Sequence, residues 1–149
     1  MKWTTSDLQQ VLEHQQYIDT VIVPLCPVSI SKENISLAEQ REDLIILTSE
    51  IERTYKGRVV IAPEFTYLLG EEAKTTRLMQ WNQEFKESGM KHIFFLTCDY
   101  DWKQLNSEME ESLIWLPALN INSLDETTQK VIVEKQLSHL NALFSKIWG

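Results

Sequence analysis

Six residues whose side chains could do chemistry follow closely after short apolar runs of the sequence. They are Cys26, Glu64, Cys98, Asp99, Asp101 and Trp102. The two cysteines could form a redox pair or supply a nucleophile, because a thiol near a helix start loses its proton more easily. The three acids could bind a hard cation through their carboxylate oxygens. We therefore treat all six as candidate ligand-binding residues.

Each of these chemistries competes with a simpler structural interpretation. Neither cysteine belongs to a C-x-x-C motif or has a basic neighbour, so both fit small buried hydrophobic residues. Asp101 fits the N-cap of a short helix over Asp101-x-x-Gln104, with the other acids solvated. The sequence therefore gives no reason to assign a catalytic residue, a metal ligand or a cofactor.

The glycines and histidines exclude the common cofactor and triad motifs. Of the four glycines, Gly57 and Gly89 fit helix ends, so neither a G-x-G-x-x-G loop nor a P-loop is present. The three histidines, His14, His92 and His139, are scattered and suggest no Ser/His/Asp or Cys/His set. Dinucleotide and nucleoside-triphosphate binding in the usual modes are therefore excluded.

Four apolar runs, each followed by a stop signal, predict the strands that position the candidates. They cover residues 20–25, 59–63, 93–97 and 113–117. All four prolines lie at or just beyond the end of a run, where a missing backbone donor is tolerated. The prolines therefore predict where the strands end. If the first strand is central, Pro24 must lie beyond its last paired amide or at a bulge.

Helical patterns alternate with these runs. Three serine-led capping boxes predict helix starts: Ser6-x-x-Gln9, Ser36-x-x-Glu39 and Ser123-x-x-Glu126. The first predicted helix spans about residues 7–16, the second ends at Lys56-Gly57 and the last spans about residues 124–147. Between them, a third helix carries an inner face of Leu78, Trp81 and Phe85.

This alternation predicts a single α/β domain over residues 1–149, built as a three-layer sandwich. The strands are apolar on both faces, as expected for a mostly parallel four-stranded sheet flanked by helices. We expect the strand order 2-1-3-4, numbered along the chain. Ligands of open α/β sheets bind beyond the C-terminal ends of the strands, so the six candidates should share one rim.

The charge balance bears on partners and location. The formal net charge is −8, from 22 acidic and 14 basic residues, and no basic run exceeds two residues. Nucleic-acid binding needs clustered cations, so we expect no nucleic-acid partner, and the same charge opposes anionic membranes. The polar first twenty residues do not resemble a signal peptide. We expect a cytoplasmic protein with free thiols.

Five tryptophans are many for 149 residues. Trp81 and Trp115 belong to predicted core stripes, whereas Trp3, Trp102 and Trp148 lie at the termini or on the predicted rim. Tryptophan is enriched at protein interfaces as well as in cores. The excess therefore favours a protein partner or a homo-oligomer.

The sequence also resembles a known family. Residues 1–3 (MKW) with Ser6-Asp7-Leu8, and residues 17–20 (YIDT) leading into Val23-Pro24-Leu25, resemble the YpiF-like family. This is a family of small uncharacterised proteins, with a domain of unknown function, from bacilli. The resemblance implies a cytoplasmic bacterial protein and carries no catalytic residues across.

We interpret the chain as a non-enzymatic protein-interaction or regulatory module. The alternative is a small-molecule-binding protein, or a small hydrolase- or transferase-type enzyme, with its site at the C-terminal ends of the strands. A rim filled by Phe65, Tyr67 and Trp102 favours the interaction module. An open rim with convergent acids favours the enzyme.

Overall fold

The computed structural model describes residues 1–104 and 112–149. Its helices are α1 (Thr5–Glu13), α2 (Ile35–Thr54), α3 (Lys74–Glu87) and α4 (Glu126–Trp148). Its strands are β1 (Thr20–Val28), β2 (Val59–Ile61), β3 (Phe65–Leu68), β4 (His92–Thr97) and β5 (Leu113–Trp115). Its described residues also form the short 3-10 turns η1 (Lys32–Asn34), η2 (Tyr100–Gln104) and η4 (Ile121–Ser123).

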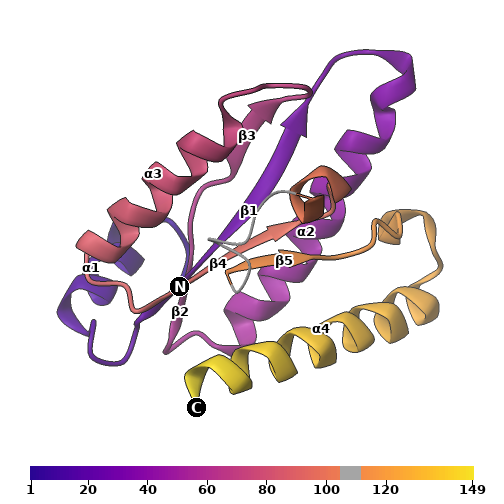
Figure 1. Cartoon of the computed structure of the whole chain (residues 1–149). Helices are drawn as coiled ribbons and strands as arrows, with labels where there is room; N and C mark the ends of the chain where they lie inside the picture. Colours follow the sequence, from indigo (N-terminus) through magenta and orange to yellow (C-terminus); the bar gives the residue numbers. More distant parts are fainter. Residues whose placement is uncertain (105–111) are drawn as a thin grey trace.

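The strands form one parallel sheet in the order β2-β1-β4-β5, with β3 also paired to β1. The four predicted strands therefore take the predicted order, and the three-layer α/β class is confirmed. The sheet differs from the prediction by the additional strand β3, which none of the four apolar runs predicts. Figure 1 shows β2 and β3 one after the other along the same side of β1.

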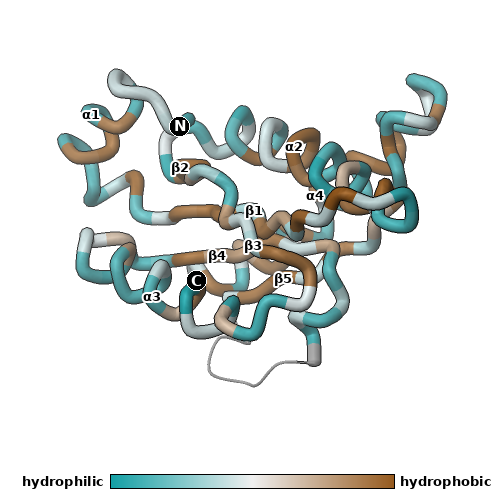
Figure 2. Tube along the Cα trace, turned by 90° about the horizontal axis from the view of Figure 1, so that it is seen from above, coloured by the Kyte–Doolittle hydropathy of each residue, from teal (hydrophilic) through white to brown (hydrophobic). Residues whose placement is uncertain are grey.

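Helices cover both faces of the sheet. Figure 2 shows α3 on one side of the strands, and α2 with α4 on the other. Odd-numbered residues of β1, such as Val23, pack with Val11 of α1 and Leu78 of α3. Even-numbered residues, such as Ile22, pack with Leu47 of α2 and the helix α4. Because side chains alternate along a strand, each run that is apolar on both faces supplies both cores.

Strand β1 continues through Pro24 and Pro27 to Val28, so the prediction that it ends at Leu25 is wrong. In a parallel ladder, alternate residues direct their backbone groups to opposite neighbours. Ile22 and Val28 accept hydrogen bonds from the β2–β3 side, at 2.9 and 3.1 Å. The nitrogen of Pro24, which carries no hydrogen, therefore faces the connection between β2 and β3. The nitrogen of Pro27 lies on the β4 side, at a position beyond the end of that strand.

A bulge separates β2 from β3. Ile22 pairs with Ile61 and Leu25 pairs with Phe65, so an advance of three residues along β1 is matched by an advance of four residues from β2 to β3. One extra residue on one strand is the definition of a β-bulge. Pro63 lies inside this bulge and interrupts the strand instead of ending it.

Both outer edges on this side of the sheet have partners of their own. The Met1 amine donates to Val59 O at 2.7 Å, and Ile61 N donates to Met1 O at 2.9 Å. On β3, Arg77 Nη2 donates to Thr66 O at 2.9 Å. These contacts cover backbone groups that an edge strand otherwise offers to another chain.

Two of the three predicted serine-led capping boxes are replaced by neighbouring caps, and the third helix start has no side-chain cap. Thr4 caps α1 and Asp125 caps α4 through their side chains, whereas α2 begins at Ile35 with no side-chain cap. Thr and Asp accept amide hydrogens as well as Ser does. Which residue becomes the N-cap depends on where the preceding segment ends. The local spacing of Ser and Glu or Gln does not determine that position.

Candidate functional site

The strand-end rim between β3 and β4 is filled by aromatic rings. The Tyr67 hydroxyl donates to Asp99 Oδ2 at 2.6 Å and accepts from Trp102 Nε1 at 2.7 Å. Tyr67 and Trp102 are each 2% exposed, and Phe65 packs against both rings. Burial, followed by the hydrogen bond to Asp99, raises the pKa of the Tyr67 hydroxyl well above its ordinary value, which keeps it a donor.

The acids of this rim are engaged with neighbours and do not converge on open space. Asp99 Oδ1 accepts from Asp101 N at 3.0 Å, so Asp99 and not Asp101 starts the turn η2. Lys74 Nζ lies 4.8 Å from the centroid of the Trp102 ring and 3.9 Å from Asp101 Oδ2. Within residues 1–104 and 112–149, no group of three or more His, Cys, Asp or Glu side chains could hold a metal ion.

The two cysteines lie on the opposite face of the sheet, in the core beneath α2 and α4. Both are buried and free. Burial, with Glu64 as the next cause, raises the pKa of Cys26 to about 12. Burial, followed by Asp43, raises the pKa of Cys98 to about 12. Such thiols are protonated at neutral pH, which argues against a nucleophile or a redox pair.

Thiol labelling tests this interpretation. With pKa values of about 12 instead of 9.0, the thiolate fraction at neutral pH falls roughly a thousandfold. We therefore expect a disulfide reagent to modify native protein far more slowly than urea-unfolded protein, in which both thiols should react at once. A thiol that reacts rapidly in the native state would contradict the assignment.

Glu64 lies in the bulge, away from the filled rim. Its Oε1 is 2.7 Å from Arg41 Nη2 of α2. This ion pair crosses from the sheet to the helix and separates two hollows that lie side by side along α2.

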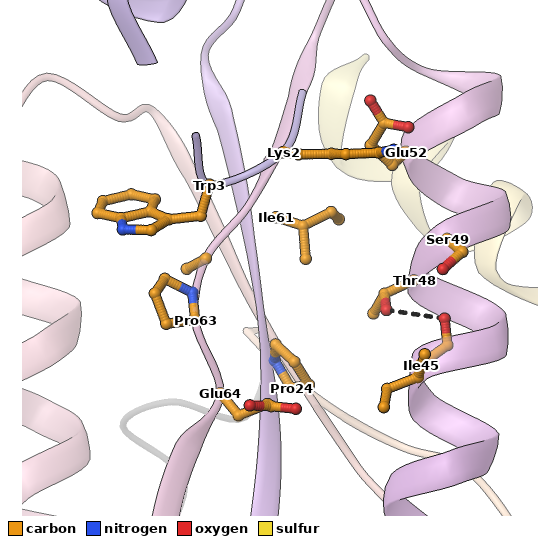
Figure 3. A pocket seen from close by; sticks show the side chains of 11 residues that line it. Lys2, Trp3, Pro24, Ile45, Thr48, Ser49, Glu52, Ile61, Pro63 and Glu64 are labelled. Carbon is orange, nitrogen blue, oxygen red and sulfur yellow. Dashed lines mark hydrogen bonds between the residues drawn. The ribbon is translucent and has the colours of Figure 1, made fainter. Parts of the chain in front are cut away.

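The first hollow has a volume of about 300 Å³ and lies over the bulge. Figure 3 shows Trp3 and Pro63 on one side of it, facing Ile45 and Thr48 of α2. Trp3 is 51% exposed here. At the far end, Glu52 is 3.1 Å from the Met1 amine.

The second hollow has a volume of about 680 Å³ and lies beyond the bulge, between the end of β1 and the first turns of α2. Its lining is mostly apolar and includes Cys26, Val28, Ile30, Ile35 and Ala38. Ile35 is 62% exposed, and Val28 and Ile30 are also exposed. We call the two hollows together the α2 groove; it extends along α2 from Ile35 to Glu52.

The structure thus divides the six candidates among three places. Asp99, Asp101 and Trp102 meet on the filled rim, as their positions after β4 predict. Cys26 and Glu64 line the α2 groove, and Cys98 lies in the core. No ligand contact tests their binding roles, which stay predictions.

The sequence analysis did not identify Asp43, which accepts more backbone hydrogen bonds than any other buried carboxylate among the described residues. Asp43 is 2% exposed and accepts backbone hydrogen bonds from Leu119, Asn120 and Ile121 at 2.8, 3.1 and 2.8 Å. It fixes the turn η4 and the left-handed residue Asn120. The available signal was its position, four residues before Leu47 on the inner stripe of α2.

The molecule is therefore a three-layer α/β protein with a filled strand-end rim and an apolar groove beside α2. None of its described helices combines the length and the apolar character needed to span a membrane.

The chain belongs to the family described as "Protein of unknown function (DUF2487)", whose model matches residues 9–148. It is 29% identical over 152 residues to the "Uncharacterized protein YpiF" of Bacillus subtilis (strain 168). That alignment covers 100% of this chain and 99% of the relative. The family resemblance predicted from the sequence is thus confirmed. No solved structure matches the chain.

Proposed function

We propose that the chain is a non-enzymatic protein-interaction module of the bacterial cytoplasm, and that the α2 groove is where another protein binds. The observation that carries the proposal is the second hollow, whose exposed Val28, Ile30 and Ile35 form a mostly apolar surface. Contiguous exposed apolar surface marks interaction sites, because it stabilises a complex when it is covered. The free, buried thiols fit a reducing compartment.

The rim supports an interaction module over an enzyme. Phe65, Tyr67 and Trp102 occupy the place where ligands of open α/β sheets bind. Both carboxylate oxygens of Asp99 accept hydrogen bonds from donors of the same chain, and both cysteine thiols stay protonated at neutral pH. These groups hold the fold together and leave no activated nucleophile or acid–base pair among the candidates.

Site-specific photocrosslinking tests the proposal. A photoreactive residue is placed at Ile35, in the α2 groove, or at Val131, which is 47% exposed on α4. The full chain is then produced in its source organism and irradiated. We expect Ile35 to give a discrete adduct with another protein, because a bound partner excludes water from that position.

Val131 is the matched control, since it is an exposed aliphatic residue of a helix outside the groove. It should give no such adduct. Equal adducts from both positions, or none from Ile35, would count against the proposal.

A further inference from the structure

We infer that the partner segment that occupies the α2 groove is an amphipathic α-helix of a different protein, with acidic residues near both ends of its apolar stripe. This inference rests on the proposed function and specifies its partner.

The β2–β3 edge, which borders the α2 groove, argues against a partner that binds there as an added strand. Strand addition needs unpaired backbone groups, and here Met1 pairs with β2 while Arg77 covers Thr66 O on β3. The surface left uncovered is a face of the sheet. On β3, Phe65 and Tyr67 are buried against α3, whereas Thr66 and Leu68 on the α2 side are exposed.

The dimensions of the α2 groove fit a helix. From Ile35 to Glu52, α2 rises about 26 Å, which is the length of a helix of about 17 residues. A helix beside α2 would cover the exposed side of β3 and complete the layer that α2 and α4 begin. Helices bind such grooves through apolar residues on one stripe.

The two hollows predict where the anchors of that helix lie. Ile35 belongs to the second hollow and Ile45 to the first, and ten residues of α2 correspond to about 15 Å. Residues eleven apart on a helix return to the same face after about three turns. A bound helix should therefore place large apolar side chains ten or eleven residues apart, one in each hollow.

The charges of the groove select an acidic helix. Four cationic groups border it, namely Lys2, Lys32, Arg41 and the Met1 amine, against the carboxylates of Glu52 and Glu64. With Asp7, whose Oδ2 accepts from Lys2 N at 2.7 Å, the local balance is four minus three, or +1, on a chain of net charge −8. Once Arg41–Glu64 and Met1–Glu52 are paired, Lys2 remains at one end of the groove and Lys32 at the other.

The same charges argue against a second copy of the chain. A two-fold dimer through this surface would bring the Lys2 end of one groove to the Lys32 end of the other, and like charges would meet. Two concave surfaces, moreover, do not fill each other.

Paired crosslinking tests this inference. Photoreactive residues are placed singly at Ile35 and at Ile45 of the full chain, and mass spectrometry locates the attachment points on the partner. A helix predicts two attachment points about ten residues apart in one segment with flanking acids, since about 15 Å spans ten helical residues. An extended segment would place them only about four or five residues apart.

Charge reversal supplies the second readout. Lys2→Glu combined with Lys32→Glu should lower the adduct yield roughly tenfold, because two favourable end contacts become repulsive. The matched control reverses two exposed lysines of α4, Lys130→Glu with Lys135→Glu, and should leave the yield unchanged.

The outcomes separate this inference from the proposed function. A basic segment, an extended spacing, an adduct with a second copy of the chain, or an unchanged yield in the Lys2/Lys32 variant overturns the acidic-helix inference while a partner still occupies the groove. The absence of any adduct at both Ile35 and Ile45 overturns the proposed function as well.

Discussion

Asp43→Asn is expected to lower the free energy of unfolding by about 2–4 kcal/mol, because an amide replaces a buried carboxylate that accepts three backbone hydrogen bonds. Asparagine keeps one acceptor oxygen, but it places an NH2 group against at least one N–H of residues 119–121. Equilibrium unfolding in urea measures the difference, and amide chemical shifts of residues 119–121 report the local change.

Glu134→Gln is the matched control, since it removes one carboxylate from an exposed position of α4. Its free energy of unfolding should stay within about 0.5 kcal/mol of the unmodified protein. A loss below about 1 kcal/mol in Asp43→Asn would mean that the turn η4 holds its shape without this carboxylate.

Tyr67→Phe is the second large effect, with an expected loss of about 2–3 kcal/mol. The ring stays, so packing is kept, but Trp102 Nε1 loses its acceptor and Asp99 loses its donor. Unfolding in urea again gives the magnitude, and the matched control is Tyr17→Phe, the same chemical change at an exposed tyrosine.

The pH dependence of that difference has a definite sign. The pKa of Tyr67 is raised above its ordinary value of 10.0 in the folded protein, chiefly by burial. The contribution of the protonated hydroxyl is therefore fully present below pH 10.0 and is lost as the pH rises above it, where the unfolded tyrosine ionises. The difference in free energy of unfolding between the unmodified protein and Tyr67→Phe should be constant near neutral pH and should become smaller above pH 10.0. A gap of the same size for Tyr17→Phe would contradict the role of the hydrogen-bonded rim.

How far the sequence predicts the fold depends on whether each element is specified locally. The continuous apolar run at residues 93–97 predicts β4, since nothing in it competes with a buried strand. The second half of β1 is not predicted, because Pro24 and Pro27 indicate the end of a strand when only the sequence is considered. Both are tolerated only because the nitrogen of each proline faces a position at which the neighbouring strand makes no ladder hydrogen bond. That arrangement depends on how β2, β3 and β4 are placed, which the local sequence does not specify.

The candidate site shows the same limit. Asp99 and Trp102 are correctly placed after β4, but their partner Tyr67 comes from β3, a four-residue strand that no local signal separates from a loop. The α2 groove is still harder to predict. It exists because no described helix covers Thr66 and Leu68, and an uncovered surface leaves no mark on the periodicity of the residues beside it.

The bulge at Pro63 also has a consequence for how the molecule opens. Two separate ladders hold the outer strand to β1, one at residues 59–61 and one at residues 65–68. Between them Ala62 N donates to Ile22 O, but Pro24 and Pro63 contribute no N–H, so this stretch has fewer backbone donors than a continuous strand of the same length. We therefore expect the amide hydrogens of residues 65–68 to exchange with solvent independently of those of residues 59–61.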